Sequence, residues 1–175
     1  MPAARTKHYG DRQIAGPRVV LRPMTEDDIA GVERWYAEAA AAVRGLPEER
    51  EGIQALHYQL EAAQADPDAG LLAIVRRGDP APIGLLDYRG NNPGSGWLTV
   101  RFIGVGRAHR GLGYGSEAVR LLEAEAWRRL GAKRFRAGVD MRNGLGLYFW
   151  LRLGYRPAAL SGGAGEALAM VREAR

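Results

Sequence analysis

One stretch constrains this chain more than any other: His109-Arg-Gly-Leu-Gly-Tyr-Gly-Ser116, between a strand-like run and an amphipathic helix. A loop in that position presents free backbone N–H groups and the positive end of the helix dipole, which together favour an anion. Glycines at 111, 113 and 115 let the backbone approach a ligand that a Cβ atom would keep away. The sequence therefore predicts a phosphate site that would suit a pyrophosphate.

The helix expected after this loop has an apolar stripe with charged residues on its other faces, as a helix packed on a sheet requires. The stripe consists of Ala118, Val119, Leu122, Ala126 and Leu130. We expect Ser116 to cap the N-terminus of this helix and Gly131 to end it.

The glycine spacing excludes the two best-known phosphate loops. No loop ends in Gly-Lys-Ser or Gly-Lys-Thr, and Ser116 stands where the dinucleotide fingerprint needs its third glycine. The pattern that remains is Arg-x-x-Gly-x-Gly, formed by Arg110, Gly113 and Gly115 after the strand-like run 97–105. The competing interpretation is a glycine-rich turn that serves packing alone.

The length and composition favour one domain. A chain of 175 residues with 46% hydrophobic and 26% charged residues is typical of a single globular core. The absence of cysteine excludes a disulfide framework, a thiolate metal site and a cysteinyl acyl-enzyme, and we expect no metal cofactor. No apolar run is long enough to span a membrane, and residues 1–12 lack the apolar region of a signal peptide, so we expect a cytoplasmic protein.

The positive charge of the chain does not indicate a nucleic-acid partner. The net charge is +5 and the pI about 9.9, but the arginines are scattered among acids instead of clustered with aromatic residues. The densest basic group is Arg128, Arg129, Lys133, Arg134 and Arg136. We interpret it as solvated surface, or as a general attraction for a phosphate-bearing ligand.

The order of expected elements defines the fold class. Residues 1–16 lack periodicity and are expected to form a flexible segment, and residues 17–175 a single domain. Strands are expected at 18–22, 71–77, 83–88, 97–105, 135–139 and 167–171. The sequence Thr25-Glu-Asp-Asp28 has the form of a capping box, so its acids are expected to cap a first helix that buries Ile29, Val32, Trp35 and Tyr36, and further helices are expected at 48–64, 116–130 and 145–153. This order predicts an α/β (α+β) fold, with a mixed, partly antiparallel sheet of about six to seven strands flanked by about four helices.

A second motif lies downstream of the glycine loop. It consists of Val139-Asp-Met-Arg-Asn143, Gly146, Phe149-Trp150 and Gly154-Tyr155. Together with the loop and the opening Leu21-Arg-Pro-Met-Thr-Glu-Asp-Asp28, it resembles the GNAT superfamily of acetyl-CoA-dependent N-acetyltransferases over nearly the whole chain from about residue 17. The opening and the two early helices look most similar to the branch with ribosomal-protein alanine and aminoglycoside acetyltransferases.

This resemblance implies a sheet splayed between strands 97–105 and 135–139, with acetyl-CoA lying in the gap. Loop N–H groups would hold the pyrophosphate, the strand edge at Ile103 and Val105 would pair with the pantetheine, and Asn143 would bond its arm. Gly146 would leave room for that arm, or serve packing. The cofactor-binding residues implied are Ile103, Val105, Arg110, Gly111, Leu112, Gly113, Tyr114, Gly115, Ser116, Asn143, Gly146, Phe149 and Trp150.

The proton donor departs from the family pattern. Acetyl transfer needs a neutral amine, a polarised carbonyl and a proton for the leaving thiolate. The family commonly uses a tyrosine for that proton, but the matching residue is Trp150, whose indole cannot act as a general acid near neutral pH. Tyr148 is the nearest phenol and the candidate acid, with a packing role for Tyr148 and a proton from solvent as alternatives.

The general base is also open, because strand 97–105 contains no carboxylate where the family often carries a glutamate. The candidates are Asp87, Asp140 and His57, and Asp87 is preferred because its strand neighbours the expected cleft. Each has a structural role as its alternative, and a chain of water molecules could replace a side-chain base.

Two functions follow from these features. The first is transfer of the acetyl group of acetyl-CoA to a primary amine by direct attack in a ternary complex, since no cysteine can carry the acyl group. The alternative is an acyl-CoA-binding module or sensor with little turnover, favoured by the missing tyrosine and strand carboxylate. The acceptor, a small molecule or a protein N-terminus, is not readable from the sequence, and a homodimer is compatible with the fold.

Overall fold

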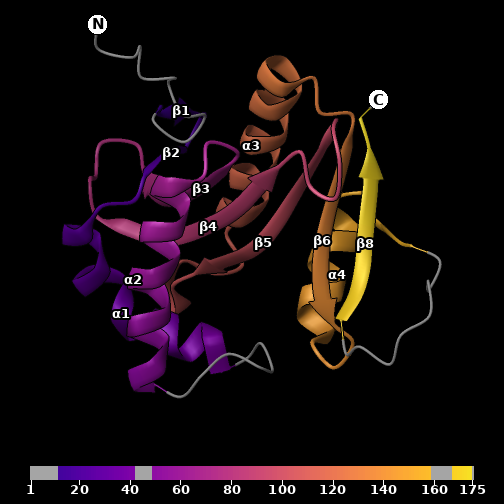
Figure 1. The fold of residues 1–175 in the computed structure, drawn as a ribbon. Coiled ribbons are helices and arrows are strands. Elements are labelled where there is room, and N and C mark those ends of the chain that lie inside the picture. Colours follow the sequence, from indigo (N-terminus) through magenta and orange to yellow (C-terminus); the bar gives the residue numbers. More distant parts are fainter. Residues whose placement is uncertain (1–11, 42–48, 159–166, 175) are drawn as a thin grey trace, which may run out of the picture.

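The computed structural model describes residues 12–41, 49–158 and 167–174, which form one eight-stranded sheet and four α-helices (Figure 1). The elements are β1 (Ile14–Ala15), β2 (Val19–Pro23), α1 (Glu26–Ala41), α2 (Glu49–Ala65), β3 (Ala69–Arg76), β4 (Pro82–Gly90), β5 (Trp97–Val105), the 3₁₀ turn η2 (Arg107–His109), α3 (Tyr114–Leu130), β6 (Arg134–Asp140), α4 (Gly144–Arg152), β7 (Arg156–Pro157) and β8 (Ala167–Glu173). All expected helices and strands are present.

The sheet has the order β1-β2-β3-β4-β5-β6-β8-β7 and is antiparallel except between β5 and β6. This confirms the mixed, partly antiparallel sheet expected from the sequence. The two additional strands, β1 and β7, are 2 residues long each, too short for an alternating pattern. Ile14 and Ala15 of β1 lie inside the segment expected to be flexible and pair with Leu21 and Val20, whereas residues 1–11 lie outside the described residues.

Two layers of helices cover the sheet (Figure 1). Helices α1 and α2 pack over β3, β4 and β5, and their apolar side chains form one core with Leu71 and Leu85. Helix α3 packs on the opposite face, where the larger core joins its apolar stripe to residues from β2 to β6 and β8. Among the described residues, no helix has the length and apolar character needed to cross a membrane.

Helix α3 begins earlier than the sequence predicts. Its N-cap is Gly113, in the left-handed conformation with φ 83°, so the expected cap Ser116 lies within the first turn and that prediction was wrong. The reason is that a glycine can turn the backbone into the helix without any side-chain cap. The expected end is confirmed, because Gly131 adopts φ 61° and its N–H bonds back to Ala126 and Trp127.

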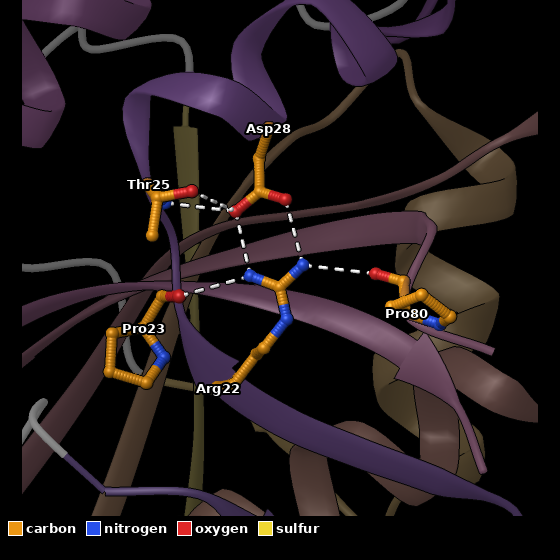
Figure 2. A network of polar contacts seen from close by, with 5 residues as sticks. All are labelled: Arg22, Pro23, Thr25, Asp28 and Pro80. Atoms are coloured by element: carbon orange, nitrogen blue, oxygen red, sulfur yellow. Dashed lines mark hydrogen bonds and ion pairs between the residues drawn. The ribbon is translucent and has the colours of Figure 1, made fainter. Parts of the chain in front are cut away.

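The start of α1 is fixed by a polar network around Arg22 and Asp28 (Figure 2). The Asp28 carboxylate accepts from Thr25 N at 2.9 Å and Thr25 Oγ1 at 3.0 Å, which confirms a capping role for this acid. Two further bonds of 2.7 Å come from the Arg22 guanidinium, which also donates to the carbonyls of Pro23 and Pro80. Burial alone would raise the Asp28 pKa, but the bonds from Arg22 and Thr25 outweigh it and lower that pKa.

Candidate functional site

Strands β5 and β6 are paired at one end only. Their parallel register runs from Trp97↔Arg134 to Val100↔Ala137, and beyond it the two strands diverge (Figure 1). The divergence begins at a bulge, because Asp87 pairs with Phe102 and Tyr88 with Val100, which leaves Arg101 as an extra residue in β5. The splay implied by the family resemblance is therefore present between these two strands.

A cavity of about 1140 Å³ occupies this divergence. Its walls come from the end of β5, the glycine loop, the first turns of α3, the end of β6, and α4. This volume is above the usual range for small-molecule pockets, and it is large enough for a long ligand. Every residue that the sequence assigned to cofactor binding lines this cavity, from Ile103 through the loop to Trp150. Their contact with a cofactor stays a prediction.

The three loop glycines differ in why the chain needs them. Gly111 and Gly113 have φ of 74° and 83°, a conformation that other residues rarely adopt. Gly115 is not constrained in this way, since a Cβ there would lie 3.5 Å from Phe149 Cε2 and 3.6 Å from Val105 Cγ2, which are ordinary contacts. The protein alone would thus tolerate a side chain at 115, and close approach of a ligand is a reason for its absence.

Two arginine side chains hold the glycine loop in place. Arg110 Nε donates to the Val105 carbonyl at 2.7 Å, which closes the turn between β5 and α3. Arg18 Nη1 donates to the Leu112 carbonyl at 2.8 Å, and Arg18 Nε is 2.8 Å from Glu117 Oε2. Sequence reasoning missed Arg18, because it lies 99 positions from Glu117 and belongs to neither motif.

The second motif forms the start of α4. Asn143 is the N-cap of this helix, and its Oδ1 accepts from the Gly146 N–H at 2.8 Å. A Cβ at residue 146 would lie 2.7 Å from Asn143 Nδ2 and would displace the Asn143 cap, which is a packing reason for this glycine. Room for a ligand is a second reason, since both residues line the cavity.

The aromatic side chains of α4 differ in their exposure to solvent. Trp150 is 5% exposed, and its ring packs against those of Phe149 and Tyr155 at centroid distances of 5.1 and 4.7 Å. Tyr148 is 59% exposed at the cavity rim, with the Arg152 guanidinium 5.7 Å from its ring. The indole is therefore part of the wall, and the phenol stands at the opening.

The candidate bases lie in three different places. Asp140 lines the cavity, and both of its carboxylate oxygens accept from the Arg142 guanidinium at 3.0 and 2.9 Å. His57 lies on the exposed side of α2, where its Nδ1 is 3.0 Å from Glu26 Oε2. Neither His57 nor Asp87 is among the residues that line the cavity.

Strand β4 neighbours β5 at the cleft, as expected, but the Asp87 side chain points to the other face of the sheet and does not line the cavity. Asp87 is 4% exposed and shares that face with Leu85, beneath α1 and α2. Its Oδ1 accepts from Arg101 Nε at 3.0 Å and Arg101 Nη2 at 2.7 Å, and Arg101 does line the cavity. Burial raises the Asp87 pKa, although the Arg101 charge opposes that rise.

A second buried acid, Glu123, lies behind the cavity. Its carboxylate accepts from the Tyr155 hydroxyl at 2.5 Å and pairs with Arg172, which joins α3 to β8. Burial raises the pKa of both Glu123 and Tyr155, and for Tyr155 this keeps the phenol protonated near neutral pH. Within residues 12–41, 49–158 and 167–174, no three histidine or acidic side chains are grouped so that they could hold a metal ion.

Known proteins share both the motifs and the fold of this chain. A family model for the acetyltransferase (GNAT) domain matches residues 18–156, and the chain belongs to this family. Its domains transfer acyl groups and generally take acetyl-CoA as the donor. A search of curated proteins gives no significant match.

Solved structures share the fold over nearly their whole length. An Agrobacterium tumefaciens acetyltransferase is 19% identical with a TM-score of 0.77, covering 93% of this chain and 95% of its own. A Vibrio cholerae protein provisionally assigned as a ribosomal-protein-serine acetyltransferase is 18% identical with a TM-score of 0.73, covering 94% and 99%. A Thermus thermophilus acetyltransferase is 20% identical with a TM-score of 0.71, covering 93% and 100%. At these identities the likeness concerns the fold alone.

Proposed function

We propose that this protein is an N-acetyltransferase that moves the acetyl group of acetyl-CoA to a primary amine. One observation carries the proposal: the residues of two separate sequence motifs, the glycine loop and the segment after β6, line a single cavity at the splay of β5 and β6. Family membership supplies the reaction class. The proposed compartment is the cytoplasm, as expected from the sequence.

The glycine loop is proposed to bind the pyrophosphate of the donor. Its N–H groups and the α3 dipole favour a double negative charge, and the absence of a Cβ at Gly115 lets the phosphates come close. The end of β5, which has no strand partner on the β6 side, offers backbone groups to the pantetheine amides. The bound thioester would supply the activated acetyl group.

The amine is proposed to attack the thioester directly, because the chain has no cysteine to carry the acyl group. Of the three candidate bases, Asp140 is the one that lines the cavity, so it is the better placed candidate to accept the ammonium proton, through water. Asp87 would act on the site only through Arg101. Tyr148 at the rim is the candidate donor of a proton to the thiolate.

A second candidate function is acyl-CoA binding with little turnover. It is favoured by the buried indole of Trp150, and by the pairing of Asp87 with Arg101 and of Asp140 with Arg142. Under this proposal the domain binds acyl-CoA as a ligand or sensor and turns it over slowly. A homodimer is compatible with either proposal, and sedimentation analysis would test it.

One experiment separates these proposals. CoA binding is measured by calorimetry, and release of free thiol from acetyl-CoA is followed with small amines, an aminoglycoside, amino acids and peptides with a free N-terminus. Binding with amine-dependent thiol release is the expected result. Binding without such release would support the sensor, and an absence of CoA binding would overturn both proposals.

A further inference from the structure

Arg18, immediately before β2, contacts the glycine loop and the first turn of α3 at once. Its Nη1 donates to the Leu112 carbonyl at 2.8 Å, and its Nε donates to Glu117 Oε2 at 2.8 Å. The guanidinium also lies over the Tyr114 ring, 5.1 Å from its centroid. The Arg18 side chain is 52% exposed and lines the cavity.

The bond to Leu112 fixes one peptide unit of the loop. The Leu112 carbonyl and the Gly113 N–H belong to the same trans peptide and point in opposite directions. Because Arg18 holds the carbonyl, the Gly113 N–H must point away from Arg18. A Cβ at Gly113 would lie 3.1 Å from Arg18 Nη2, so the glycine also permits this close contact.

The ion pair removes an unfavourable charge from the site. Glu117 lies in the first turn of α3, where its carboxylate would repel an anion bound at the loop. Its side chain is 13% exposed and accepts from the backbone N–H groups of Arg18 and Val19 at 2.8 and 3.0 Å. Burial would raise the Glu117 pKa, but these bonds and the Arg18 guanidinium lower it, so the carboxylate is charged and Arg18 neutralises it.

We propose that Arg18 is a positioning residue for the anion loop, which orients the Leu112–Gly113 peptide and neutralises Glu117 so that the loop can bind a pyrophosphate. This inference rests on the proposed function, because the pyrophosphate is that of the acyl-CoA donor. It assigns to the segment before β2 a part of the site that neither sequence motif contains.

The test compares a ligand that carries the pyrophosphate with one that lacks it. CoA affinity is measured by calorimetry and pantetheine affinity by NMR titration, for the wild type, Arg18→Ala and Arg18→Lys. Losing a charge-assisted hydrogen bond predicts roughly tenfold weaker CoA binding by Arg18→Ala, with unchanged pantetheine affinity. Arg18→Lys should restore only part of the CoA affinity, because a lysine cannot hold both partners in a fork.

Two further variants complete the design. Arg76→Ala is the matched control, since Arg76 is also a half-exposed arginine paired with an acid, Asp79, and does not line the cavity. It should leave both affinities unchanged. Glu117→Gln in the Arg18→Ala background should regain part of the lost CoA affinity, because the amide can still accept from the backbone N–H groups without repelling the ligand.

The outcomes separate this inference from the proposed function. If the wild type binds CoA and Arg18→Ala binds it equally well, or loses CoA and pantetheine in equal measure, the positioning role is refuted and the acyl-CoA site stands. If the wild type does not bind CoA, the proposed function fails and this inference fails with it.

Discussion

The Arg22–Asp28 pair offers the sharpest test of how this fold is held together (Figure 2). The Arg22 side chain is 19% exposed and that of Asp28 is 8% exposed, and the guanidinium joins β2, the start of α1 and the Pro80 carbonyl. Replacing Arg22 by methionine keeps most of the aliphatic stem and leaves a buried carboxylate with bonds from Thr25 alone.

Breaking a buried ion pair by removing one partner costs about 3–5 kcal/mol. Water can reach part of the Arg22 site, so we expect the lower end for Arg22→Met, about 3 kcal/mol in the free energy of unfolding. For a chain of this size that loss lowers the melting temperature by roughly 6–12 °C. The double variant Arg22→Met/Asp28→Asn should lose less free energy of unfolding than the two single variants together, because no unpaired buried charge remains once both partners are replaced.

The effect should depend on pH in a defined direction. The Asp28 pKa is lowered in the folded protein, so the stabilising contribution is present above the unfolded pKa of about 3.9 and is lost as pH falls through the folded pKa. The difference between wild type and Arg22→Met should therefore shrink below about pH 4.

Urea denaturation followed by circular dichroism, at neutral pH and at acid pH, measures both effects. Arg76→Ala, which breaks the exposed pair with Asp79, should leave the denaturation midpoint almost unchanged. A loss under about 1 kcal/mol for Arg22→Met at neutral pH, or a loss that is the same at acid pH, would refute the reasoning.

Three other predictions concern the site and the core behind it. Gly113→Ala forces a side chain into φ 83° and should cost about 1–2 kcal/mol of stability, whereas Gly115→Ala should leave the denaturation midpoint nearly unchanged and still weaken CoA binding in calorimetry. Equal stability of the two variants would contradict the conclusion that backbone conformation requires glycine at 113 but not at 115. Tyr148→Phe should lower kcat about 10²-fold with little change in KM for acetyl-CoA if the phenol donates the proton, and an unchanged kcat removes it from catalysis. Tyr155→Phe removes the donor to buried Glu123 and should cost about 1–3 kcal/mol in urea denaturation without changing CoA affinity, while a stability equal to wild type would contradict the hydrogen bond.

The elements were readable from the sequence because each is a local pattern. Short apolar or alternating runs mark β3 to β6, the apolar stripe marks α3, and Thr25 to Asp28 has the form of a helix cap. The two-residue strands β1 and β7 were missed, since a strand this short has no period and forms only where a neighbour pairs with it. The cap of α3 was misplaced because a left-handed glycine turns the backbone into the helix where a serine side chain was expected to cap it.

The sequence by itself carries two motifs in a fixed order along the chain, and every residue that they assign to cofactor binding lines the cavity. Only the tertiary structure decided how those residues are used. It placed Asp87 on the face of β4 that α1 and α2 cover, and Asp140 at the end of β6 that lines the cavity, because tertiary packing decides which face of each strand the helices cover. It also brought Arg18 to Leu112 and Glu117 across 94 and 99 positions, a contact that no local pattern encodes.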